Sequence, residues 1–104
     1  MFRIAILSAA LAAGSLFSTA ASAQGCGWYA FAGAYQSYGR AQRQANRVGG
    51  YVVNVDNSNS PNAGRGFFAV AAGPTSRSGA NSARRRFQRN GVGSAYVANR
   101  CFYG

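Results

Sequence analysis

The sequence predicts an α+β domain with the element order β-α-β-β-α-β, a four-stranded antiparallel sheet with two helices on one face. The first observation is an internal likeness between residues 33–53 and 73–98. Each of the two segments begins with an apolar stretch and a small-residue turn. An arginine-rich helical stretch, a glycine stop and a second apolar stretch follow in that order. The second observation is that these apolar stretches are rich in aromatic and β-branched residues, which favours strands. The third is a pair of cysteines, Cys26 and Cys101, that flank the whole pattern.

Residues 1–23 have the features of an export signal. Arg3 gives a positive start, residues 4–17 are apolar, and Ala21-Ser22-Ala23 is a small-x-small cleavage site. The apolar run is shorter than the roughly 20 residues of a membrane span, so none is expected after cleavage. A lipidated Cys26 is the rival interpretation, which the lack of a preceding Leu disfavours. The expected mature chain, residues 24–104, is one domain in the periplasm or secreted.

The first predicted helix covers residues 38–48. Ser37 can cap its start, and Gly49 offers the left-handed residue that favours a helix end. The inward stripe follows helical spacing and contains Tyr38, Ala41, Ala45 and Val48.

The second predicted helix covers residues 77–90, with Asn90-Gly91 as its stop. Ala80, Ala83 and Phe87 form its inward stripe. Both helices therefore have one apolar face for a sheet.

Strands are predicted at residues 28–32, 51–55, 67–72 and 95–102, and residues 57–64 form a polar, turn-forming loop. Two helices on one face of such a sheet make a ferredoxin-like layer pair. In that arrangement the first and last strands are antiparallel neighbours, which brings Cys26 beside Cys101. Because exported proteins meet an oxidising environment, the two cysteines are expected to form one disulfide.

Charge and composition point away from catalysis. The chain has eleven arginines and one acid, Asp56, with no Lys, Glu or His; loss of Arg3 with the signal leaves ten arginines and a net charge of +9. General acid–base chemistry needs His or paired carboxylates, and metal sites need several ligands of those types. We therefore expect no enzyme, no cofactor and no metal, and a surface that attracts anions.

Several short motifs resemble the SPOR (sporulation-related repeat) family, the peptidoglycan-binding module of bacterial envelope proteins. Residues 31–35, Phe-Ala-Gly-Ala-Tyr, stand where the family has Gln-x-Gly-Ser-Phe. Residues 67–74 form an aromatic-rich strand that closes in Gly-Pro, as the family's does. The resemblance covers residues 28–102, including both helices with their glycine stops. It implies a glycan-binding domain whose open sheet face holds strands stripped of their stem peptides.

The chain departs from the family pattern at three positions. Phe31 replaces a frequent Gln, Ala34 a Ser, and Ala69 an Arg of the third strand. Phe67 keeps the family's aromatic residue, and Tyr35 is expected in the core at the turn into the helix. These departures put the family's ligand in question more than its fold.

Alternation along the strands predicts which side chains share a face. If the helices cover the side of Trp28, Phe68 and Val70, the opposite face is open and carries exposed rings. An aromatic platform of that kind can stack on sugars or bases, and the alternative is packing against a loop or a partner. The candidate glycan-binding residues are Tyr29, Phe31, Phe67 and Ala69.

The arginines of the two helices suggest a different function. They form basic faces that are ordinarily solvated but can hold anionic envelope polymers such as lipopolysaccharide. The candidate anion-binding residues are Arg40, Arg43, Arg47, Arg84, Arg85, Arg86 and Arg89. A third hypothesis is nucleic-acid binding, since residues 65–70 partly resemble the third-strand signature of an RNA-recognition motif. Export argues against it, and no specific nucleic-acid partner is expected.

Overall fold

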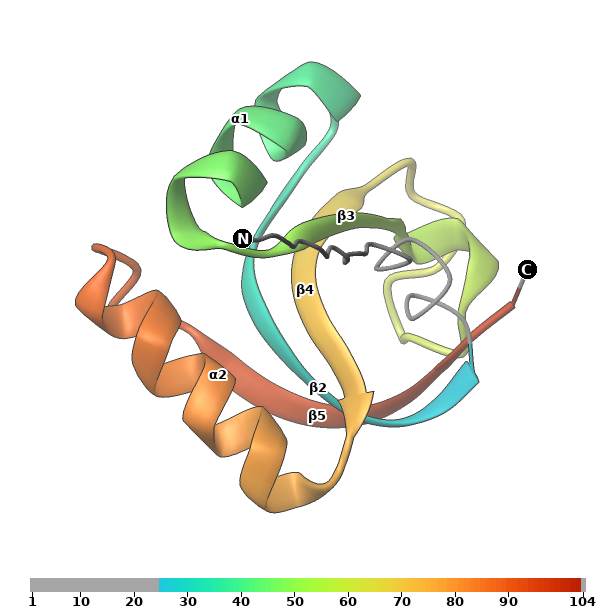
Figure 1. Ribbon diagram of the computed structural model, residues 1–104. Helices are drawn as coiled ribbons and strands as arrows, with labels where there is room; N and C mark the ends of the chain where they lie inside the picture. The colour runs from blue at the N-terminus through green and yellow to red at the C-terminus, as the bar shows by residue number, and fades with distance from the viewer. Residues whose placement is uncertain (1–24, 104) are drawn as a thin grey trace, which may run out of the picture.

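The structure, a computed structural model, describes residues 25–103, so the predicted signal at 1–23 lies outside the described residues. Four strands form one sheet in the order β3-β4-β2-β5, and every neighbouring pair is antiparallel. Two helices lie on one side of it (Figure 1). The predicted α+β fold is confirmed. Its elements are β2 (Gly25–Tyr35), α1 (Tyr38–Val48), β3 (Tyr51–Asn54), the 3-10 turn η4 (Val55–Asn57), β4 (Phe68–Thr75), α2 (Arg77–Arg89) and β5 (Tyr96–Phe102).

Helix α1 begins and ends at the residues that the sequence predicts. The Ser37 side chain accepts a hydrogen bond from the amide of Arg40, and Gly49 ends the helix with a φ of 81°. Only Gly adopts that left-handed conformation without strain. The predicted inward stripe is wrong at Tyr38. Its side chain is 57% exposed, and its ring contacts the Phe68 ring edge-on. The buried residues of α1 are Ala41, Ala45 and Val48, so the stripe that faces the sheet begins one turn later than predicted.

Helix α2 also follows its pattern. Ser76 caps it by accepting from the amide of Gly79, and Asn90 is its C-cap. The inward residues of both helices pack on the sheet and make a first core. Its fully or almost fully buried members are Ala30, Ala32, Ala41, Ala45, Val48, Val70, Ala83, Phe87 and Ala95. Tyr35 packs against this core as predicted, but it is partly buried and is the last residue of β2 rather than part of a turn.

The strands are longer or shifted relative to the sequence prediction. β2 runs on to Tyr35 because its register against β4 shifts between Phe31 and Ala34, which absorbs residues expected in a turn. β3 ends early, at Asn54, where η4 turns the chain away. β2 thus becomes the long central strand that pairs with both β4 and β5.

The disulfide is present as predicted. Cys26 and Cys101 face each other in the register of β2 and β5 and form a disulfide across 75 residues. It links the beginning of the first strand to the end of the last. Within residues 25–103, no helix has the length and apolar character that crossing a membrane requires.

Candidate functional site

The sheet has a second apolar cluster on the face away from the helices. The predicted alternation is confirmed in direction, because Tyr29, Phe31 and Ala69 all lie on this face. The prediction that the face is open is wrong. Tyr29, Phe31 and Ala69 are 0%, 6% and 4% exposed, since the β3–β4 connection (residues 55–67) folds over them. In Figure 1 this connection lies on the opposite side of the strands from α1 and α2.

Asp56, the one acidic residue, fixes the shape of this connection. Its Oδ1 accepts hydrogen bonds from the amides of Gly64 at 2.7 Å and Gly66 at 3.1 Å. Its own amide donates to Oδ1 of Asn54. The carboxylate therefore ties the beginning of the connection, where Asp56 lies, to its end at Gly64 and Gly66.

The connection is also attached to the outer edge of β5. The Asn59 amide donates to the carbonyl of Cys101, and Asn59 Oδ1 accepts from the Cys101 amide. Further on, the Tyr103 amide donates to the carbonyl of Asn57 at 2.7 Å. Ser58, between these contacts, pairs with Phe102 in an isolated antiparallel β-bridge at the edge of the sheet. These contacts are all at the end of β5. The connection makes none of them at the start of β5, and an opening lies there.

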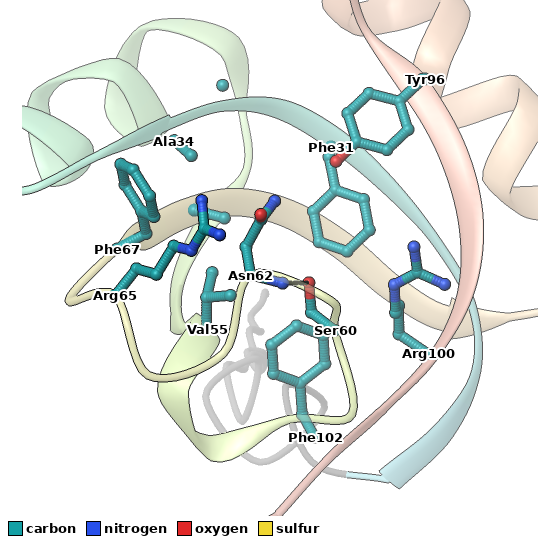
Figure 2. A pocket seen from close by; sticks show the side chains of 12 residues that line it. Phe31, Ala34, Val55, Ser60, Asn62, Arg65, Phe67, Tyr96, Arg100 and Phe102 are labelled. Carbon is teal, nitrogen blue, oxygen red and sulfur yellow. Dashed lines mark hydrogen bonds between the residues drawn. The ribbon is translucent and has the colours of Figure 1, made fainter.

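A pocket of about 320 Å³ lies at this opening (Figure 2). Its apolar surface comes from rings of β2, β5 and the end of the connection, and its polar rim comes from the connection and from Arg100 of β5. A volume of this size is at the lower end of the range of about 300–1,000 Å³ for small-ligand pockets. The lining residues are Phe31, Gly33, Ala34, Val55, Ser60, Asn62, Arg65, Phe67, Ala69, Tyr96, Arg100 and Phe102.

The rings of the pocket contact one another around Phe31. The Phe31 centroid lies 5.4 Å from that of Tyr96 and 6.2 Å from that of Phe102. Tyr29 packs beneath, edge-on to Phe102 at 4.9 Å, and burial raises its pKa. These rings hold one another in place, so the apolar wall is formed without a ligand. Tyr96 remains 55% exposed at the mouth, where a ligand can reach it.

Two arginines give the pocket its charge. In Figure 2, Arg65 and Arg100 stand on opposite sides of the Phe31 ring. The Arg100 guanidinium donates only to the carbonyl of its neighbour Asn99, and the Arg65 guanidinium has no hydrogen-bond partner among the described residues. No acidic residue lines the pocket. The site is therefore a small aromatic pocket with two guanidinium groups at its rim.

The pocket includes most of the candidate glycan-binding residues. Phe31, Phe67 and Ala69 line it, whereas Tyr29 lies outside the lining as buried support. Sequence reasoning missed the contributions of β5 and of the connection. Period-two alternation along β5 would have placed Tyr96, Arg100 and Phe102 on this face. No local signal would have shown that Ser60, Asn62 and Arg65 fold back over the sheet.

The seven helical arginines lie in the other layer of the molecule. Six are exposed and Arg84 is partly buried. Arg47 and Arg86 have structural contacts, because each donates to a backbone carbonyl at the end of the opposite helix. The seven residues therefore do not extend the pocket, and they form a separate basic surface.

Comparison with known proteins found no match to any family model, curated protein or solved structure. The resemblance to the SPOR family stays a prediction that rests on the sequence motifs.

Proposed function

We propose that this chain is a non-catalytic binding protein for the glycan strands of peptidoglycan, and that the aromatic pocket is its binding site. The observation that carries the proposal is the pairing of a preformed ring wall with two arginines that have no carboxylate partner within residues 25–103. The proposed location is the periplasm or the cell exterior. The disulfide between Cys26 and Cys101 favours such an oxidising compartment.

The chemistry of a glycan strand fits the chemistry of the pocket. The apolar face of a pyranose ring stacks on aromatic side chains such as Tyr96 and Phe67. Its hydroxyl and acetamido groups match the hydroxyl of Ser60 and the amide of Asn62. Removal of a stem peptide leaves a free carboxylate on the lactyl group of muramic acid, and guanidinium groups bind carboxylates in a paired geometry.

The absence of catalysis is part of the same proposal. No histidine occurs in the chain, and the one carboxylate, Asp56, already accepts from two amides of the connection. A glycosidase would need two carboxyl groups beside the scissile bond. Binding without cleavage is what these residues support.

Co-sedimentation of the oxidised protein with purified sacculi tests the proposal. Sacculi are compared before and after an amidase has removed the stem peptides, and we expect stronger pelleting after removal. Arg65→Gln/Arg100→Gln should weaken pelleting by about tenfold or more, because it removes two charge-assisted contacts. Arg43→Gln/Arg89→Gln is the matched control, since it removes the same charge from exposed positions in the helix layer.

The two double variants separate recognition from general attraction. Equal loss of pelleting in both, or equal pelleting on stripped and intact sacculi, would contradict the proposal. Phe67→Ala adds an uncharged test. It removes a ring from the pocket, and its effect should persist at high salt, where charge attraction is screened.

A further inference from the structure

A basic patch lies where the C-terminal ends of α1 and α2 meet. Arg47 Nη1 donates to the carbonyl of Asn90 at 3.0 Å, and Arg86 Nη2 donates to the carbonyl of Gly49 at 3.1 Å. These reciprocal bonds hold the two helix ends side by side. Arg43 precedes Arg47 by about one turn of α1, and Arg89 is the last residue of α2. We name the four exposed side chains the helix-junction patch: Arg43, Arg47, Arg86 and Arg89.

The charge of this patch is not compensated within the described chain. Neither helix has an acidic residue in its first turn, and the acceptor beside Arg47 is the neutral amide of Gln44. Asp56 lies in the β3–β4 connection, on the far side of the sheet, where it accepts from backbone amides. Like charges on neighbouring turns repel. An external anion would relieve that repulsion.

The side-chain type favours phosphate. All basic residues of the chain are arginines, and the guanidinium fork donates to a phosphate through two parallel hydrogen bonds. Arg47 and Arg86 are already ordered by their carbonyl contacts, so they lose less freedom on binding. The apolar faces of both helices are buried in the first core. Contact with a membrane would therefore be made at the level of the headgroups and without insertion.

We propose that the helix-junction patch binds the phosphate groups of an anionic lipid surface. The choice of lipid rests on the proposed location, because at the cell exterior or in the periplasm envelope lipids are within reach and most nucleic acid is not. The proposal goes beyond glycan binding, because the patch and the pocket are on opposite sides of the sheet. A molecule that lies on a membrane through its helices would present the pocket away from it, toward the cell wall.

Vesicle binding of the oxidised protein without residues 1–23 tests this proposal. Vesicles of equal parts phosphatidylglycerol and phosphatidylcholine are compared with vesicles of phosphatidylcholine alone, at low and at physiological salt. Each arginine near an anionic surface contributes about fivefold in affinity, so Arg43→Gln/Arg89→Gln should weaken binding roughly 25-fold. Neither side chain makes a hydrogen bond to another described residue, and the fold should be kept. Arg65→Gln/Arg100→Gln removes the same charge from the pocket and should weaken binding less than about threefold.

The proposal is overturned if both double variants lose affinity equally, because net charge alone would then explain adsorption. Equal binding to the neutral vesicles would overturn it as well. Tighter binding to a mixed-sequence DNA duplex than to the anionic vesicles, per phosphate and through the same patch, would overturn the lipid assignment. Failure here leaves the glycan proposal standing, since sacculus pelleting depends on Arg65 and Arg100 and vesicle binding does not.

Discussion

Asp56 decides the shape of the pocket although it does not line it. Its Oδ1 accepts from the amides of Gly64 and Gly66, and these bonds return the chain to the start of β4 after it has crossed the face of the sheet. Arg65 lies between the two glycines, so the position of its guanidinium at the rim depends on the same carboxylate. A single acid among the ten arginines of residues 25–103 would ordinarily be expected to form an ion pair. The structure instead gives it backbone amides.

The variants Asp56→Ala and Asp56→Asn show whether the hydrogen-bond acceptor at Oδ1 or the negative charge of Asp56 stabilises the connection. Asp56→Ala should lower the free energy of unfolding by about 1 kcal/mol, because two exposed amides lose their acceptor. It should also speed hydrogen exchange at Gly64 and Gly66. Asp56→Asn keeps the oxygen in place and should stay closer to the wild-type protein in both measurements. If the Asn variant is as unstable as the Ala variant, the charge and not the acceptor position is what matters.

The elements were largely predictable because their determinants are local. A cap at Ser37, a left-handed residue at Gly49 and apolar positions at helical spacing define α1 without reference to the sheet. The same holds for α2 with Ala80, Ala83 and Phe87. Strand ends were predicted less well, because β2 continues through a shift in register that only its pairing with β4 requires.

Contacts between elements depend on small residues at close approaches. Gly50 lies between the end of α1 and β4, where an added Cβ would be 2.9 Å from Cγ1 of Val70 and 3.0 Å from the carbonyl oxygen of Ala71. It would also lie 3.2 Å from the Phe87 ring. The first core therefore leaves no room for a methyl group there.

Gly50→Ala should lower the free energy of unfolding by about 1–3 kcal/mol, the usual cost of overpacking a core. Gly93→Ala is the matched control, because no atom lies within 4 Å of the Cβ it would add. Urea unfolding of the two oxidised variants gives the comparison. Equal midpoints for Gly50→Ala and Gly93→Ala would show that the helix end moves away at little cost.

At the scale of the whole molecule, two layers lie on opposite faces of one sheet. The helix layer buries small side chains and presents arginines outward, while the other layer consists of a 13-residue connection over a cluster of rings, residues 55–67. The disulfide joins the two ends of this small fold. Domains of this size bury too little surface to be very stable unaided.

Removal of the disulfide should therefore have a large effect. Closing a loop across 75 residues stabilises by about 4 kcal/mol in the chain-entropy model, so Cys26→Ser/Cys101→Ser should unfold at much lower urea. The Cys101 carbonyl also accepts from the Asn59 amide, and the Cys101 amide donates to Asn59 Oδ1, so the connection should loosen with the end of β5 and pelleting on sacculi should fall. The reduced wild-type protein should match the double variant. An unchanged urea midpoint would mean that the sheet alone holds the ends together.

The sequence by itself determined the element order, the caps, the disulfide and the direction in which the strand side chains point. These features depend on local spacing and on the topology that the spacing implies, so the order of residues along the chain is enough to predict them. Only the tertiary structure decided that the second face is covered, because the polar connection has no periodicity and is placed by distant contacts such as Asn59 with Cys101. The tertiary structure also decided which arginines belong to the same site. Arg65 and Arg100 share a pocket, and Arg47 and Arg86 share a helix junction, because long-range packing brings distant parts of the chain together.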